Sequence, residues 1–284
     1  MARPLRIQYP DALYHITVRG NERRNIFLDD FDRLLFLTIL AQMIDTHHLR
    51  CYAYCLMDNH FHLLLETPDG NISRAMHDLN GYYAQLFNKI HDRVGHLFQS
   101  RFYASLVDKD EYLLESARYI VLNPVRAKLV TKPDEWKWSS YRVTANPHTS
   151  PPWMQSHWIL SLFSRQTQIA VTAYKQFVQD GMKQNTFHPQ KRNGSVFGGP
   201  WFTHDVLKKI DDAENQKDIP RSERMIGRPM LTDVFYDVKN KQERNAAIVF
   251  AHKRCGYPLS HIASLIQLDA STVGKIAREK YHVD

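Results

Sequence analysis

The stretch CYAYCLMDNHFHLLLE, residues 51–66, decides the fold. Two apolar runs, Cys51–Met57 and His60–Glu66, have the length and composition of strands, and Asp58-Asn59 between them is a turn signal. The stretch therefore predicts a β-hairpin whose side chains alternate between the two faces of a sheet.

The sequence on either side of the hairpin predicts alternating strands and helices. Upstream, Leu13–Arg19 alternates as a strand up to the turn signal Gly20-Asn21, and a helix capped by Asp29 or Asp30 runs to about residue 45. Downstream, residues 71–91 predict a helix despite Gly81, and residues 95–107 are strand-like in part. A third helix opens at Asp108 with Glu111 in a capping box and ends at Pro124. The order β-α-β-β-α-β followed by a helix predicts an α+β, ferredoxin-like antiparallel sheet with helices on one face.

The remainder of the chain predicts a mostly helical C-terminal region. The turn-rich break 144–152 favours a first domain over residues 1–145, an extension over 146–235 and a C-terminal domain over 236–284. The extension contains a helix near 167–179 and a loop-like basic stretch at 183–200. Residues 240–255 predict a helix, and 259–266 with 270–280 predict a helix-turn-helix with an apolar seam at Ile262, Ala263, Ile266, Val273 and Ile276.

Composition indicates a globular protein with a basic second half. The 284 residues carry a formal net charge of +7, and residues 151–284 hold 19 basic against 13 acidic side chains. Such a surface favours a nucleic-acid partner. No apolar run is long enough to span a membrane, the first residues lack a signal-peptide pattern, and three cysteines imply no disulfide framework, so we expect a cytoplasmic protein.

The motif His60-Phe61-His62 lies in the second strand of the hairpin. The period of two places both imidazoles on one face, where they form a natural pair of metal ligands. A pair of hydrogen-bonded sheet histidines without metal explains the same pattern, so the spacing alone leaves both interpretations open.

The third helix offers a polar stripe of Tyr112, Ser116, Tyr119 and Asn123 at the edge of its apolar arc. Tyr119 and Asn123 are neighbours if the helix persists up to Pro124. An Asn123 oxygen beside two histidines completes a metal shell, and the Tyr119 phenol then faces a group that the metal polarises. Packing of the tyrosine at a core edge is the alternative.

Two other groups of residues compete for a role. Cys51 and Cys55 are expected on one face of their strand, but this spacing favours buried, inert thiols over a zinc site. We expect four arginines to contact DNA phosphates: Arg19, Arg23, Arg24 and Arg101. The rings of Phe102 and Tyr103 are expected to stack on unpaired bases. Four residues are expected to line the exposed face of the last helix and to contact DNA: Ser271, Thr272, Lys275 and Arg278.

Several of these segments carry a resemblance to the REP-associated tyrosine transposases, which are IS200-like members of the single-tyrosine HUH endonuclease superfamily. They are CYAYCLMDNHFHLLLETP, GHLFQSRFYASLV, RYIVLNPVRAKLV, RGNERR and WKWSSYR, and they cover roughly residues 8–145. Further on, YKQFVQDG and GSVFGGPWF resemble an extension of some members, and ASLIQLDASTVGKI resembles their terminal helix-turn-helix.

The resemblance implies a nickase and strand transferase for single-stranded, hairpin-forming DNA such as repetitive extragenic palindromes. It implies a bacterial protein at the nucleoid. By position, His60 and His62 match the two metal ligands of the HUH motif, and Asn123 matches the third ligand. Tyr119 matches the nucleophile that forms a 5′-phosphotyrosine. Tyr112 is the second choice for this nucleophile. The implied cofactor is Mg²⁺ or Mn²⁺, and both monomers and homodimers occur among relatives.

Two other functions fit the same residues. One is a non-catalytic DNA-binding regulator that uses the fold and the C-terminal helices. The other is a metal-dependent nuclease whose nucleophile is water, which needs no tyrosine.

Overall fold

The computed structural model describes residues 8–183, 196–211, 231–236, 238, 240–254 and 257–278. The chain divides into two compact units, the first of which is Gln8–Arg192 with Val196–Gly199. The second contains Pro200–Asp284. The limits of the domains expected from the sequence, after residues 145 and 235, stay predictions.

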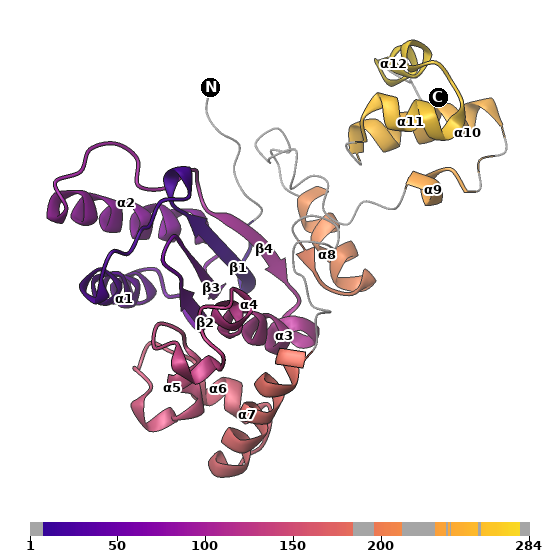
Figure 1. Cartoon of the computed structure of the whole chain (residues 1–284). Coiled ribbons are helices and arrows are strands. Elements are labelled where there is room, and N and C mark those ends of the chain that lie inside the picture. Colours follow the sequence, from indigo (N-terminus) through magenta and orange to yellow (C-terminus); the bar gives the residue numbers. More distant parts are fainter. Residues whose placement is uncertain are drawn as a thin grey trace. The chain divides into compact units, whose positions relative to one another are not determined.

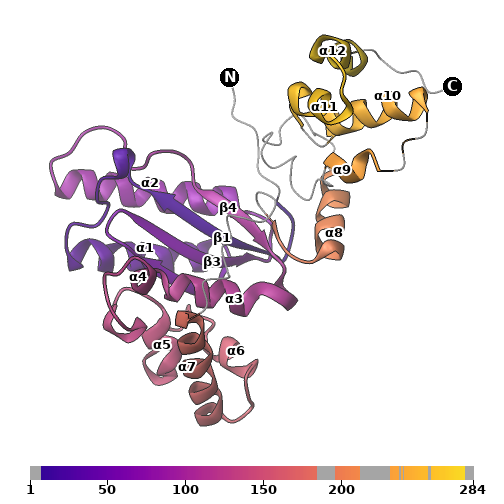
Figure 2. The ribbon, with the colours of Figure 1, turned by 45° about the vertical axis from the view of Figure 1, so that its right-hand side comes forward.

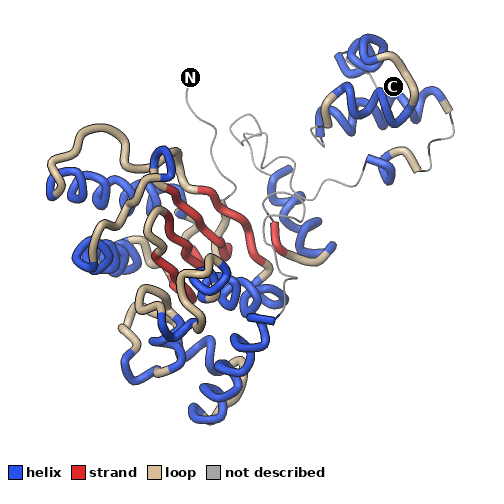
Figure 3. Tube along the Cα trace, in the orientation of Figure 1, coloured by secondary structure: helices blue, strands red, loops and turns tan. Residues whose placement is uncertain are grey.

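The first unit is built on a five-stranded sheet with the order β2-β3-β1-β4-β5 (Figure 3). The first four strands are antiparallel: β1 (Ala12–Arg19), β2 (Arg50–Leu56), β3 (His60–Thr67) and β4 (Tyr103–Val107). Their order is that of a ferredoxin-like fold, which confirms the predicted fold class. The sequence missed β5 (Val196–Phe197), which pairs in parallel with β4 inside a stretch expected to be loop.

One face of the sheet is covered by α1 (Asp30–Thr46) and α2 (Ile72–Ile90), as Figure 1 shows. The strands turn alternate apolar side chains toward these helices. Phe61 of β3 packs on Phe36 of α1, with ring centroids 4.5 Å apart, and Phe36 packs on Tyr83 of α2. The N-terminus of α1 is capped by the side chain of Asp29, which accepts a hydrogen bond from the backbone of Asp32.

The opposite face of the sheet is covered by α3 (Lys109–Val121), which corrects the expectation of helices on one face only. The Asp108 side chain caps α3 as predicted, because it accepts from the backbone amides of the first turn. Pro124 does not stop the helical path. Leu122 keeps near-helical dihedral angles and α4 (Asn123–Arg126) follows at once, with the proline in its first turn, where no backbone donor is needed.

Residues 133–183 complete the first unit on the α3 side of the sheet (Figure 2). The elements are η2 (Pro133–Glu135), α5 (Tyr141–Ala145), η3 (Pro147–Thr149), α6 (Ser156–Ser161) and α7 (Thr167–Lys183), the last of which confirms the helix predicted near 167–179. Tyr141 of α5 and Tyr174 of α7 share one apolar core with Ile120 of α3. The segment between η2 and α5 runs along β2, since Ser140 donates from its backbone to Tyr54.

The second unit is helical in the part that the structure describes. It contains α8 (Pro200–Asp211), α9 (Leu231–Val234), α10 (Lys241–Val249), a π-helical turn (Phe250–Arg254), α11 (Leu259–Ile266) and α12 (Ala270–Arg278). Gln267 closes α11 in a left-handed conformation with a φ of 53°. The expected seam between α11 and α12 is present, with Ile262, Ala263 and Val273 buried and Ile266 and Ile276 packed against them.

Among the described helices, none combines the length and the apolar character needed to cross a membrane.

Candidate active site

The two histidines of β3 share the face of the sheet that α3 covers. Their ring centroids are 5.1 Å apart. His62 is buried, whereas His60 at the start of the strand is partly exposed. In the antiparallel register, Thr17 of β1 lies opposite His62 and Arg19 lies opposite His60. The pairing therefore adds two β1 side chains to the histidine face.

Hydrogen bonds fix which ring nitrogen of each histidine is available. The Nδ1 atom of His62 lies 3.1 Å from Nε2 of His15 and 3.0 Å from Oγ1 of Thr17. The Nδ1 atom of His60 donates to Oδ1 of Asn59 at 2.6 Å. The oxygen of Asn59 can only accept, so Nδ1 of His60 carries the hydrogen and Nε2 the lone pair. In His62 both partners lie at Nδ1, so Nε2 is the ring nitrogen left for a ligand, as in a histidine that binds a metal.

The site keeps its histidines uncharged. Burial lowers the pKa of His60 to about 4, and the nearby charge of Arg19 acts in the same direction. Burial also holds the pKa of His62 well below its ordinary value and lowers that of His15 to about 4. At neutral pH all three rings are therefore neutral, and their lone pairs suit a cation and not an anion.

Tyr119 of α3 lies across from these rings. Its ring centroid is 6.3 Å from that of His62 and 5.7 Å from that of His15, both in edge-on geometry. Burial raises the pKa of the phenol, and the guanidinium of Arg126, 4.7 Å over the ring, acts in the opposite direction. Arg126 also donates to the carbonyl of Tyr119 at 3.3 Å. The phenol is thus protonated at rest, and its ring is held between the sheet and Arg126.

Asn123 remains one turn after Tyr119, because the helical path persists through Leu122. Its Nδ2 atom donates to the carbonyls of Tyr119 at 3.0 Å and Ile120 at 3.3 Å. These contacts orient the amide through its nitrogen, so Oδ1 is the atom with lone pairs for a cation. No cluster of three His, Cys, Asp or Glu side chains suited to a metal occurs in the described residues. A metal held by the two histidines would therefore need an amide or water as a further ligand.

Tyr112, the second choice for a nucleophile, lies two helical turns before Tyr119 on α3. It is partly buried and packs against the core shared by α3, α5 and α7. The ring contacts with His15 and His62 described above belong to Tyr119, which favours Tyr119 as the tyrosine of the site.

The two cysteines of β2 do not share a face, contrary to the expectation from alternation. A register shift between Cys51 and Ala53 leaves Cys51 opposite Leu65 and Cys55 opposite His62, which point to opposite faces of β3. Both thiols are buried, and burial raises their pKa. This geometry favours inert core thiols.

The four arginines expected to contact DNA phosphates lie at the end of the sheet that carries His60. The loop after β1 is tied to the turn before β3, since Gly20 donates to the carbonyl of Asn59 and the Asn59 side chain donates to the carbonyl of Arg23. Arg19, Arg23 and Arg24 are exposed there, and Arg24 pairs with Glu22 at 2.6 Å. Arg101 is also exposed, just before β4.

The residues expected to face DNA in the last helix lie on its outer side. Ser271, Thr272 and Lys275 are exposed, whereas Val273 and Ala277 are buried against α10 and α11. Arg278 ends α12, and its side chain lies outside the described part.

Sequence reasoning missed His15, Thr17 and Arg126 as members of this site. The signal for the first two was present, because strand alternation and antiparallel pairing place residues 15 and 17 on the face of His62. Arg126 reaches Tyr119 only because the chain stays helical past Pro124, and no local pattern predicts that.

The sequence of the first unit is similar to that of known proteins. Residues 8–123 match the family model of the IS200-like transposases. A Haemophilus influenzae protein described as a REP-associated tyrosine transposase is 26% identical over 141 residues, which cover 46% of this chain and 80% of the relative.

Two solved structures are also similar. One is a REP-associated tyrosine transposase bound to a REP hairpin, at 16% identity and a TM-score of 0.44, covering 53% of this chain and 89% of that one. The other is a transposase from Deinococcus radiodurans, at 20% identity and a TM-score of 0.31, covering 43% and 97%. The resemblance seen in the sequence is thus confirmed: the chain is similar to the REP-associated tyrosine transposases, and its residues 8–123 match the model of the IS200-like transposase family.

Proposed function

We propose that this protein is a metal-dependent endonuclease and strand transferase for single-stranded DNA that works through a 5′-phosphotyrosine. The observation that carries the proposal is the placement of the Tyr119 ring against the paired histidines of β3. The match of residues 8–123 to transposases supports DNA as the substrate. The relative named for its association with REP sequences supports a palindromic, hairpin-forming target.

The residues present fit a divalent cation such as Mg²⁺ or Mn²⁺. His60 and His62 would hold it through Nε2, because hydrogen bonds occupy Nδ1 in both rings, and Oδ1 of Asn123 would supply a third ligand. When bound, the cation would polarise the non-bridging oxygens of the scissile phosphate. His15 and Thr17 would act as positioning residues, since they fix the ring of His62.

Tyr119 performs the covalent step in this proposal. Its Oη atom forms a bond to phosphorus while the bond from phosphorus to the 3′ oxygen breaks. The phenol gives up its proton as it attacks, and the released 3′ oxygen takes up a proton. Burial favours the neutral phenol, so nucleophilic strength develops only during attack. The phosphodiester becomes a 5′-phosphotyrosine, and a second 3′-hydroxyl can reverse the step without ATP.

A covalent-capture gel tests the proposal. The purified chain is mixed with labelled hairpin oligonucleotides and Mn²⁺ and then denatured in SDS. We expect a shifted, metal-dependent band that is lost in Tyr119→Phe and in His60→Ala and kept in Tyr112→Phe. Cleavage without any band would favour a water nucleophile. Salt-sensitive binding without cleavage across a panel of hairpins would favour a regulator.

A further inference from the structure

A short, strained turn (residues 20–24) follows β1 at the end of the sheet that carries His60. Inside it, both Glu22 and Arg23 adopt the left-handed backbone conformation, with φ of 54° and 60°. Residues other than glycine rarely adopt this conformation, so contacts with neighbouring groups must hold it. The turn is also closed tightly, because a Cβ on Gly20 would lie 2.1 Å from the Arg24 carbonyl oxygen. The position of the Arg23 carbonyl therefore depends on the shape of this turn.

The side chain of Asn59 connects the turn to the candidate metal ligand His60. Its Nδ2 atom donates to the Arg23 carbonyl at 3.1 Å, and its Oδ1 atom accepts from Nδ1 of His60 at 2.6 Å. The backbone makes a parallel connection, since Gly20 donates to the Asn59 carbonyl at 2.9 Å. A single amide group thus has its donor on the turn and its acceptor on the histidine ring.

The orientation of the Asn59 amide decides which tautomer His60 adopts. A carbonyl oxygen can only accept, so the amide atom that faces Arg23 must be the nitrogen, and the atom that faces His60 must be the oxygen. Nδ1 of His60 then carries the hydrogen, and Nε2 carries the lone pair. An amide turned the other way would donate to Nδ1, which would place the hydrogen on Nε2 and leave no lone pair there for a cation.

The partners of His62 are of a different kind. Nδ1 of His62 lies near Nε2 of His15 and Oγ1 of Thr17, and each of these groups is able to donate or to accept. Both partners belong to β1, inside the sheet, and His62 is buried. The two histidines that would share a cation are therefore oriented by different parts of the chain: His62 by the sheet, and His60 by the turn.

We propose that Asn59 is a positioning residue that makes metal binding at His60 depend on the turn after β1. The Arg23 carbonyl fixes the Asn59 amide, and the amide fixes the tautomer of His60 that is able to bind a cation. The inference rests on the proposed function for the metal site. Because Arg23 and Arg24 are exposed on this turn, Asn59 connects two of the expected DNA contacts to a metal ligand.

Calorimetric titration of the full chain with Mn²⁺ tests the two contacts of Asn59 separately. Asn59→Asp keeps an oxygen for His60 but loses the donor to Arg23, whereas Asn59→Ala loses both. We expect Asn59→Ala to weaken Mn²⁺ binding about tenfold. Asn59→Asp should bind Mn²⁺ at least as tightly as the wild type, because a carboxylate partner raises the basicity of a ligating histidine. Equal losses of affinity in the two variants would overturn the proposal.

A change in the turn tests whether its shape affects the metal site. Glu22→Val and Glu22→Gly both remove the carboxylate that pairs with Arg24, but only valine opposes the left-handed conformation. Glu22→Val should weaken Mn²⁺ binding several-fold, whereas Glu22→Gly should leave it unchanged. In the Asn59→Asp background Glu22→Val should have no effect, since the carboxylate orients His60 without the turn. The same loss of affinity in both backgrounds would contradict the proposal.

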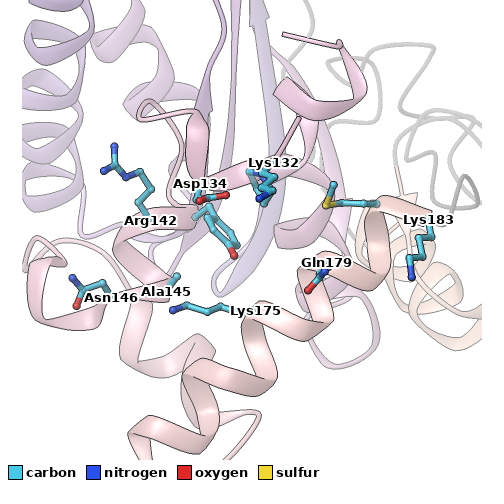
Figure 4. Close-up of a pocket in the computed structure, with 11 residues that line it drawn as sticks. Lys132, Asp134, Arg142, Ala145, Asn146, Lys175, Gln179 and Lys183 are labelled. Carbon is cyan, nitrogen blue, oxygen red and sulfur yellow. The ribbon is translucent and has the colours of Figure 1, made fainter. Parts of the chain in front are cut away.

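Asn146 provides the matched control in the same unit. It is exposed and lines a cavity of about 780 Å³ between η2, α5 and α7, as Figure 4 shows. Asn146→Asp and Asn146→Ala repeat the chemical changes made at Asn59, but outside the turn and outside β3, and should leave the Mn²⁺ affinity unchanged. A loss in Asn146→Ala as large as that in Asn59→Ala would assign the effect to general stability and overturn the proposal.

The tautomer of His60 gives a measurement that needs neither metal nor DNA. Nitrogen NMR of the metal-free chain at neutral pH should show the hydrogen on Nδ1 in the wild type and in Asn59→Asp, and a shift toward Nε2 in Asn59→Ala. The signals of His60 are identified by their loss in His60→Gln. The expected tautomers in a chain that binds Mn²⁺ but forms no DNA adduct would retain the role of Asn59 and refute the nuclease. Adduct formation by a wild type with the hydrogen on Nε2 would overturn the role of Asn59 alone.

Discussion

His15 of β1 and His62 of β3 face one another across the central strand pair, with Nε2 of the first 3.1 Å from Nδ1 of the second. Both rings are buried, and the contact joins adjacent strands of the sheet. It leaves Nε2 of His62 as the nitrogen for a ligand, so the orientation of a candidate metal ligand depends on a residue outside the His60-Phe61-His62 motif.

The contact predicts a large effect of His15 on metal binding. His15→Phe keeps a ring in the core but removes the hydrogen-bond partner of His62, and loss of such partners typically weakens metal affinity by roughly 10- to 100-fold. Calorimetric titration with Mn²⁺ measures the change, and circular dichroism checks the fold. Unchanged Mn²⁺ affinity in a folded His15→Phe would show that the contact has no such role.

Alanine substitutions at two glycines should change the free energy of unfolding in opposite directions. A Cβ at Gly20 would lie 2.1 Å from the Arg24 carbonyl, so Gly20→Ala must displace the loop after β1 and should lower the free energy of unfolding by about 1–3 kcal/mol. A Cβ at Gly81, inside α2, would meet no atom within 4 Å, so Gly81→Ala should raise the free energy of unfolding by about 0.5–1 kcal/mol. Urea unfolding at constant protein concentration compares the two variants. A destabilised Gly81→Ala would contradict the packing described for α2.

The buried histidines predict acid sensitivity of the metal-free protein. Burial depresses the pKa of His15 to about 4, below the ordinary value of 6.5. Between these values the unfolded chain binds more protons than the native one, so this contribution to stability is complete above pH 6.5 and is lost as the pH falls to 4. For His15 the loss is at most about 3 kcal/mol. Urea unfolding from pH 7 to pH 4 measures it.

The control for this pH dependence is His15→Phe, which should show a shallower loss of stability over the same range. An identical pH profile in the variant would assign the acid sensitivity to other groups.

The last helix predicts a separate contribution to DNA binding. Lys275 is exposed on α12 beside Ser271 and Thr272. If this face meets phosphates, Lys275→Gln should reduce the salt slope of duplex binding by about 1, while Lys241→Gln on α10 should change it less. Filter binding over a range of salt concentrations gives both slopes. Equal slopes for wild type and Lys275→Gln would remove α12 from the DNA-binding surface.

Much of the first unit could be predicted from the sequence because its signals are local. The alternation in β1, the cap at Asp108 and the turn at Asp58-Asn59 each act within a few residues. The sequence also contains a local indication that both faces of the sheet are covered. Leu63, Leu64 and Leu65 form a continuous apolar run, as expected for a strand that is buried on both faces.

Other features depend on partners that are distant in sequence. The strand β5 has only two residues, too few for a period, and forms by pairing with β4. The shift at Cys51 and Ala53 is a property of pairing with β3, so alternation misplaced the cysteines. Arg126 meets Tyr119 only because α4 accommodates Pro124 in its first turn. The candidate histidines and tyrosine could be named from the sequence, but not their supporting contacts.

The most direct test of the account is to identify the residue that becomes attached to DNA. The adduct formed with Mn²⁺ and a hairpin oligonucleotide is digested with trypsin and a nuclease, and mass spectrometry locates the remaining nucleotide. The account predicts a 5′-phosphodeoxynucleotide on Tyr119, and none in the protein when Tyr119→Phe is used. Attachment at Tyr112 or at another side chain, or cleavage of the DNA without any attached nucleotide, would contradict it.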